Sequence, residues 1–234
     1  MSEAVWHEHE DGERLARELA SAIAGRLDQG IAARGHAVLV VSGGTTPQKL
    51  FRHLSQQTLD WDRVSITLAD ERLVAPADPR SNEGMVRRLL LSGPAARAGF
   101  VPLFSPETDP GAAAEIAGRR IAALPVPFDV VVLGMGLDGH TASIFPDAPP
   151  GLTDPSSPHA VLPVHSGHAP EPRLTLTLAW LVRAHHIFVH IEGEAKRRIL
   201  RQCLAGAPRL PIGEVIRHAR QPVHIHWAPT GEVS

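Results

Sequence analysis

The sequence predicts an α/β fold with an open, mostly parallel sheet and helices on both faces, of the Rossmann-like kind. Short runs of β-branched and other apolar residues recur along the chain, as in strands that are buried on both faces. Stretches with helical spacing lie between these runs, and such alternation favours parallel strands joined by helices. No Pro/Gly/Ser-rich linker divides the 234 residues, so we expect a single domain over 1–234.

The first half of the chain alternates clearly. Apolar residues recur at helical spacing over Asp11–Leu27, and Gly30 is predicted to lie beyond the end of that helix. Pro47 suits the first position of a helix, and Ser81 is a favoured cap residue. In chain order we expect the helix Asp11–Leu27, the strand Ala37–Val41, the helix Thr46–Leu54, the strand Val64–Leu68, a helix from Ser81 to Leu91, a helix from Asp109 to Ala123 and the strand Phe128–Leu133.

The second half begins with a stretch rich in proline and glycine. Residues 147–172 are predicted to be loop around one strand, and Leu174–Leu178 alternates like a strand whose partner the sequence does not reveal. Regular alternation then resumes. We expect the strands Ala160–Val164, His186–Ile191 and Val223–Trp227 and the helices Glu194–Leu204 and Ile212–His218.

Composition narrows the functional classes. The net charge is −2, which argues against a nucleic-acid or membrane surface. Cys203 is the one cysteine, is predicted to belong to the core, and fits a reducing compartment. The acidic N-terminus does not resemble a secretory signal, and no apolar run approaches the length of about 20 residues that spans a bilayer. We therefore expect a cytoplasmic protein, with monomer and weak dimer equally open.

Residues 129–146 carry the strongest functional signal, DVVVLGMGLDGHTASIFP. The apolar strand stops at Gly134 and Gly136, and Asp138 and His140 follow directly. This position is the carboxyl end of the strand, the edge at which open α/β sheets bind ligands. His140 is therefore a candidate acid–base residue, because imidazole ordinarily titrates near pH 6.5.

Further segments at strand ends are candidates for binding an anion. Ser42-Gly43-Gly44-Thr45 joins a strand to a helix, so its N–H groups and the helix dipole suit a phosphate; a capped tight turn is the structural alternative.

Two other segments place charges at the same sheet edge. Asp70 and Arg72 follow the strand Val64–Leu68, although a local ion pair of a surface loop explains them equally well. Lys196 stands in the first turn of a helix, where the helix dipole disfavours a cation, and an anion bound nearby would explain this position.

The scattered histidines, including His224 and His226, show no metal-ligand motif, and we expect no metal site.

Taken together, the motifs resemble the 6-phosphogluconolactonase family. The resemblance rests on SGGTTP at 42–47, DER at 70–72 with RSN at 80–82, GLDGHTASIFP at 136–146, PRLTLT at 172–177 and GEAK at 193–196, in the order of that family. The block that includes His140 is specific to it. The glycine loop and the Gly-x-x-Lys segment are shared with glucosamine-6-phosphate deaminases and with sugar-phosphate-sensing regulators.

The resemblance implies hydrolysis of 6-phospho-D-glucono-1,5-lactone to 6-phospho-D-gluconate, the second step of the oxidative pentose phosphate pathway, without a metal or organic cofactor. It implies that His140 is the general base and that Asp138 orients its ring. The implied binding residues are Ser42, Gly43, Gly44, Thr45, Asp70, Arg72, Arg173 and Lys196, with the phosphate among Thr45, Arg72, Arg173 and Lys196. Which arginine contacts the phosphate stays open, and a backbone N–H near Gly43–Gly44 or Arg72 is expected to stabilise the oxyanion.

Two alternatives are weighed against this interpretation. Glucosamine-6-phosphate deaminases have a tyrosine at the position of Arg72 and a catalytic glutamate at that of Phe145. Sugar-phosphate sensors carry a DNA-binding module, for which the residues ahead of Ala37 are too few. The chain also departs from the lactonase pattern, with Asp147 where the family often has glycine and Glu83 where it commonly has an aromatic residue.

Overall fold

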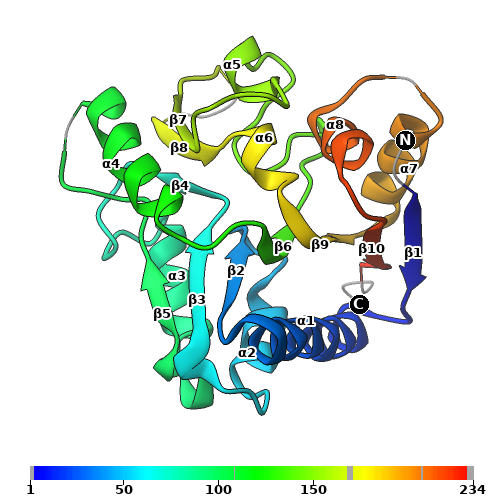
Figure 1. The fold of residues 1–234 in the computed structure, drawn as a ribbon. Helices are drawn as coiled ribbons and strands as arrows, with labels where there is room; N and C mark the ends of the chain where they lie inside the picture. Colours follow the sequence, from blue (N-terminus) through cyan, green and yellow to red (C-terminus); the bar gives the residue numbers. More distant parts are fainter. Residues whose placement is uncertain (1–2, 108, 168–170, 207, 231–234) are drawn as a thin grey trace.

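A computed structural model describes residues 3–107, 109–167, 171–206 and 208–230. Its main sheet contains seven strands in the order β1-β10-β9-β6-β2-β3-β5, and all neighbouring strands are parallel. The sheet has helices on both faces (Figure 1). Helix α1 lies on one face of the sheet, where its Glu18 pairs with His9. Helix α7 lies on the other face, where its Arg197 packs over the ring of Trp227. The predicted fold class is confirmed.

The elements follow the predicted alternation closely. The strands of the main sheet are β1 (Ala4–Glu8), β2 (Ala37–Val41), β3 (Val64–Leu68), β5 (Gly99–Val101), β6 (Phe128–Leu133), β9 (Ala184–Glu192) and β10 (Val223–Ala228). The helices are α1 (Gly12–Arg34), α2 (Gln48–Ser55), α3 (Asn82–Leu89), α4 (Pro110–Ala122), α5 (Pro150–Thr153), α6 (Leu178–Leu181), α7 (Glu194–Leu204) and α8 (Pro211–His218), with short 3₁₀ turns at Trp61–Arg63 and Gly93–Arg97.

The order of the strands creates a crevice between β2 and β6. From β2 the chain continues through β3 and β5 on one side, and then returns through β6, β9 and β10 on the other. The connection that follows β2 leads toward β3, and the connection that follows β6 leads toward β9, in the opposite direction. The carboxyl ends of β2 and β6 therefore border a gap, and open α/β sheets bind ligands in such gaps. The glycine loop and the segment with His140 both begin at this point.

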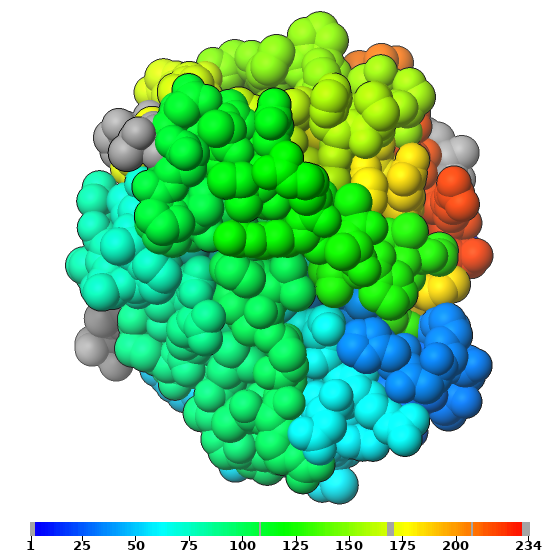
Figure 2. Space-filling view, turned by 60° about the vertical axis from the view of Figure 1, so that its left-hand side comes forward, coloured from blue at the N-terminus to red at the C-terminus, as the bar shows by residue number. Residues whose placement is uncertain are grey.

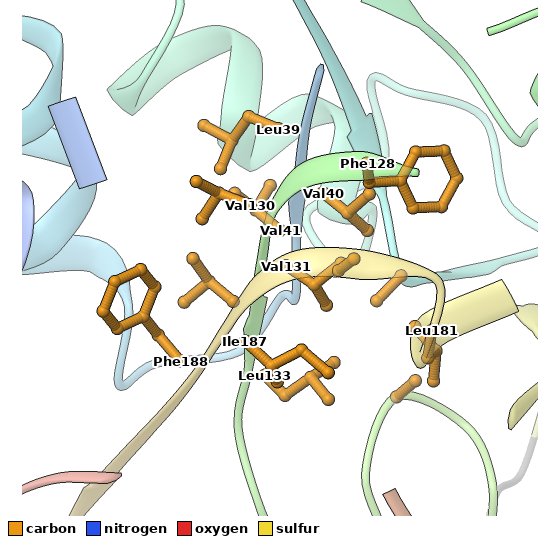
Figure 3. Packing of buried hydrophobic residues seen from close by; sticks show 14 of the residues in the cluster. Leu39, Val40, Val41, Phe128, Val130, Val131, Leu133, Leu181, Ile187 and Phe188 are labelled. Atoms are coloured by element: carbon orange, nitrogen blue, oxygen red, sulfur yellow. The ribbon is translucent and has the colours of Figure 1, made fainter. Parts of the chain in front are cut away.

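The central strands form the core of the protein. β2 and β6 are buried along their whole lengths, which explains their continuous apolar sequences. Side chains from β2, β6 and β9 pack together, including Leu39, Val131 and Ile187 (Figure 3). This core holds the carboxyl ends of the three strands in a fixed relation, and those ends carry the candidate site.

A second, smaller sheet lies beside the site and is not foreseen by the sequence. It consists of β4 (Asp70–Arg72), β8 (Arg173–Leu176) and β7 (Val161–Val164), paired antiparallel in the order β4-β8-β7. Arg72 is directly opposite Arg173 in this pairing. Helix α4 packs against β7 and β8 and covers this side of the molecule (Figure 2).

Two details of the N-terminal region differ from prediction. Gly30 lies inside α1, which continues to Arg34 and ends at Gly35. The glycine is needed there because a Cβ atom would overlap the carboxylate of Asp129, which contacts Arg34. The segment Ala4–Glu8 forms β1, which pairs with β10 at the edge of the sheet. In the described part of the chain, no helix has both the length and the hydropathy needed to cross a bilayer.

Candidate active site

A cavity of about 270 Å³ opens at the crevice between β2 and β6. Its lining includes most of the residues that the sequence singles out: Ser42, Gly43, Gly44, Thr45, Asp70, Arg72, His140, Arg173 and Lys196. Asp138 is outside the lining and contacts His140 from behind. Residues from segments far apart in the sequence therefore meet at one place.

A tight turn after β6 holds His140 against Asp138. The Nδ1 atom of His140 lies 2.6 Å from Oδ1 of Asp138, which also accepts a hydrogen bond of 3.1 Å from the His140 backbone. The turn closes through a bond of 2.9 Å from the N–H of Gly136 to the His140 carbonyl, and a Cβ at Gly136 would overlap the imidazole ring. The structure thus holds the imidazole of His140 fixed and partly exposed.

The contact defines which ring nitrogen carries the proton. An ionised carboxylate only accepts hydrogen bonds, so Nδ1 of a neutral His140 must be the donor and Nε2 is left unprotonated. Partial burial by itself would raise the pKa of Asp138, but the hydrogen bonds and charge of His140 outweigh it and lower that pKa below its ordinary value. Asp138 therefore stays ionised at neutral pH.

The glycine loop forms one wall of the cavity. The loop leaves β2 at Ser42, whose N–H donates to the Val132 carbonyl at 3.1 Å, and leads into α2 through Pro47. Gly43 packs so closely against the amide of Asn82 that a Cβ atom would overlap it. In the described part of the chain, the buried Oγ of Ser42 makes no hydrogen bond. The loop therefore offers donor groups to the cavity.

The Asp-Glu-Arg segment divides into two buried carboxylates and a partly buried guanidinium. The carboxylate of Asp70 accepts a hydrogen bond of 2.6 Å from the hydroxyl of Ser143, and Glu71 is fully buried. The Glu71 carboxylate accepts backbone hydrogen bonds of 2.7–2.8 Å from Arg72, Asn82 and Glu83. It therefore caps α3 as well as fixing the strand, and of this segment Asp70 and Arg72 line the cavity.

The arginines of the site gather around one carboxylate. Glu171 lies 3.8 Å from Arg72, 3.8 Å from Arg80 and 3.5 Å from Arg173, measured between nitrogen and oxygen atoms. Arg72 also donates a hydrogen bond of 3.0 Å to the Arg80 carbonyl, and it contacts the side-chain oxygen of Asn82. These contacts hold two guanidinium groups at the cavity wall, as bidentate recognition of an anion requires.

Lys196 is the third cationic side chain of the cavity lining. It stands in the first turn of α7 after Gly193, and burial lowers its pKa while Glu192 acts in the opposite direction.

Sequence reasoning missed Asn82 and His190, which also line the cavity. The position of His190 at the carboxyl end of β9 was the available signal. Among the described residues, no group of His, Cys, Asp and Glu side chains is arranged to hold a metal ion.

Comparison with known proteins shows the family of the chain. The sequence model of the family described as glucosamine-6-phosphate isomerases/6-phosphogluconolactonase matches residues 10–227. A 6-phosphogluconolactonase from Mesorhizobium japonicum is 50% identical over 226 residues, which cover 96% of this chain and 95% of that protein. One from Rhizobium meliloti is 46% identical and covers 97% and 99% of the two chains. The crystal structure of a 6-phosphogluconolactonase from Shewanella baltica superposes with a TM-score of 0.91 at 38% identity, over 97% and 98% of the chains.

Proposed function

The chain belongs to the glucosamine-6-phosphate isomerase/6-phosphogluconolactonase family, and on this basis we propose that it hydrolyses 6-phospho-D-glucono-1,5-lactone to 6-phospho-D-gluconate in the pentose phosphate pathway. The observation that carries the proposal is the convergence of the Asp138–His140 pair and three cationic side chains, Arg72, Arg173 and Lys196, on one cavity. Such a cavity supplies a base and an anion-binding wall, and lactone hydrolysis needs both.

His140 is the general base of the proposed reaction. Its Nε2 takes a proton from a water molecule as that water attacks the lactone carbonyl, and Asp138 stabilises the imidazolium that forms. The tetrahedral intermediate then collapses with cleavage of the bond between the carbonyl carbon and the ring oxygen. The imidazolium returns its proton to that oxygen, so the ring opens to a hydroxyl group and a carboxylic acid, which then releases its proton to the solvent and becomes a carboxylate.

The binding side of the proposal divides the cavity between the phosphate and the lactone. Thr45, Arg72, Arg173 and Lys196 receive the 6-phosphate, because a hydroxyl donor and three cations suit a dianion. The oxyanion of the intermediate is stabilised by a backbone N–H near Gly43–Gly44 or by Arg72. Asp70, bonded to Ser143, orients Arg173 from 4.0 Å rather than contacting the phosphate.

Phe145 favours the lactonase over a deaminase. It occupies the place of the catalytic glutamate of the deaminases, and its ring centre lies 4.9 Å from that of His140 in a buried position. A phenyl ring transfers no proton, whereas lactone hydrolysis needs only one activated water molecule.

We further propose that the protein acts as a single domain in the cytoplasm, as a monomer or weak dimer, on a small phosphorylated sugar lactone and without nucleic acid or membrane partners.

The proposal is tested by hydrolysis of freshly generated 6-phosphogluconolactone near pH 7, with the spontaneous opening subtracted. We expect the wild-type protein to be fast, and His140→Ala to fall close to the spontaneous rate while it still binds 6-phosphogluconate. A variant that keeps most of the activity would remove His140 as the base and leave the activity in place. A wild-type protein that adds nothing to the spontaneous rate would reject the lactonase and favour a non-catalytic sugar-phosphate sensor.

A further inference from the structure

A buried histidine that the mechanism does not use lines the same cavity. His190 is 3% exposed and is located near the carboxyl end of β9. Within the described part of the chain, Nδ1 of its ring has no hydrogen-bond partner, and Nε2 has only the Glu192 carboxylate at 3.5 Å, longer than an ordinary hydrogen bond. Buried polar groups without partners are rare because they cost free energy, and in a binding cavity they indicate a partner that arrives with the ligand.

The other unsatisfied groups of this cavity indicate the charge of that ligand. Ser42 Oγ, Arg72 Nε and Arg173 Nε are buried, line the cavity and make no hydrogen bond among the described residues. Each of these atoms carries a hydrogen and can donate it. A ligand that satisfies all of them must be rich in acceptors, as a phosphate group is.

Charged and titratable groups face His190 from three elements. On its own strand, Glu192 places Oε1 at 3.5 Å from Nε2 of the ring. Lys196 approaches from α7, and His226 of β10 is the register partner of His190. Burial, as the largest influence, and then Lys196 lower the pKa of His190, while Glu192 opposes them. The ring is therefore neutral near pH 7 in the free protein.

We propose that His190 is a further binding residue of this cavity, which takes up one proton when a phosphate dianion binds and is then held as an imidazolium between that dianion and Glu192. The inference rests on the proposed function for the identity of the phosphate compound. The proton comes from the solvent and adds to the unprotonated ring nitrogen, and no bond of the ligand changes. The driving force is the attraction between a buried cation and two anions in a poorly hydrated site.

Isothermal calorimetry with sulfate provides the test. Sulfate remains a dianion near pH 7, so any proton taken up enters the protein, and titrations in buffers of different ionisation enthalpy count it. We expect the wild-type protein to take up as much as one proton per site. His190→Gln keeps a hydrogen-bond donor but cannot titrate, and it should bind sulfate roughly tenfold more weakly with no uptake. His218→Asn changes an exposed histidine of α8 outside the cavity lining and should leave the uptake unchanged.

A second measurement follows the protonation of the ring directly in the wild-type protein. The ¹⁵N signals of the imidazole rings are followed in the wild-type protein, with His190 assigned by the signal that His190→Gln lacks, and we expect that signal to move to the imidazolium position when sulfate is added. The inference is overturned if wild type binds no sulfate, if binding takes up no proton, or if the uptake disappears in His140→Ala but persists in His190→Gln. Lactone hydrolysis is assayed separately, so a protein that takes up the proton but lacks lactonase activity would reject the proposed function alone.

Discussion

His140 and Asp138 form a hydrogen-bonded pair, 2.6 Å between Nδ1 and Oδ1, inside a turn whose backbone bonds also join these residues. The carboxylate thus fixes both the orientation of the ring and its tautomer. In the proposed reaction the base is Nε2, and Asp138 acts entirely through His140.

The first prediction concerns this pair. Asp138→Asn should lower kcat about 100-fold with little change in KM, because the amide neither selects the tautomer reliably nor stabilises the imidazolium by charge. Initial rates of lactone hydrolysis at several substrate concentrations measure it. The same change in the His140→Ala background should have almost no effect, since the two residues act as a unit. Equal effects in both backgrounds would contradict a function through His140.

The second prediction concerns the buried carboxylate of Glu71. Burial raises its pKa, while the bonds from Arg72, Asn82, Glu83 and Ser81 act in the opposite direction. Both oxygens accept two hydrogen bonds each, so the NH₂ group of Glu71→Gln would face donors wherever it is placed. We expect the free energy of unfolding to fall by about 2–3 kcal/mol.

Urea unfolding measures this loss, with Glu115→Gln on the exposed surface of α4 as the matched control. The control should change stability by less than about 0.5 kcal/mol. KM of Glu71→Gln should also rise, because Glu71 holds the segment of Asn82 and Arg72. An unchanged stability would show that the cap of α3 does not depend on this carboxylate.

The sequence predicted those elements whose pattern is local. The strands Ala37–Val41, Val64–Leu68 and Phe128–Leu133 and the helix Glu194–Leu204 agree with the structure in both bounds, because an apolar run or a helical spacing carries all the information. The edge strand Ala4–Glu8 was missed. Its sequence AVWHE contains two polar residues, and an edge strand needs no continuous apolar run.

The site could be predicted where its residues follow strand ends. This rule located the glycine loop, Arg72, His140 and Lys196, and the structure places them in one cavity. Contacts between distant segments could not be read in the same way. The pairing of Arg72 with Arg173 depends on an antiparallel sheet that joins residues about one hundred positions apart, and the burial of Glu71 depends on α3. His190 was missed because it lies inside β9, two residues before the strand ends, whereas the rule considers residues that follow a strand.

The third prediction compares two glycines of α1. A Cβ at Gly30 would overlap the Asp129 carboxylate, whereas a Cβ at Gly25 would meet nothing within 4 Å. Gly25→Ala should therefore stabilise the protein by about 0.5–1 kcal/mol through helix propensity. Gly30→Ala should destabilise it by about 1–3 kcal/mol, because α1 must move away from the sheet. Urea unfolding of both variants decides, and two changes of the same sign would contradict the packing described.

The fourth prediction concerns the imidazoles stacked between β1 and β10. His9 Nε2 lies 3.1 Å from His226 Nδ1, and His7 Nε2 lies 2.9 Å from His224 Nδ1. Each contact needs one nitrogen without a proton, so both rings of a pair cannot be charged without loss of the hydrogen bond. Burial, followed by the neighbouring histidines, lowers the pKa of His226 to about 2, and burial also lowers that of His224.

Acid should therefore unfold the protein through these residues. The unfolded chain binds protons at its histidines as the pH falls through about 6.5, while the folded protein does not, so stability declines from there toward lower pH. Urea midpoints between pH 7.5 and 5 measure the decline, and His226→Gln should make it shallower by removing one titrating group. His218→Gln, at a partly exposed position on α8, should leave the slope unchanged. An equal slope for His226→Gln and wild type would mean that other groups cause the acid sensitivity.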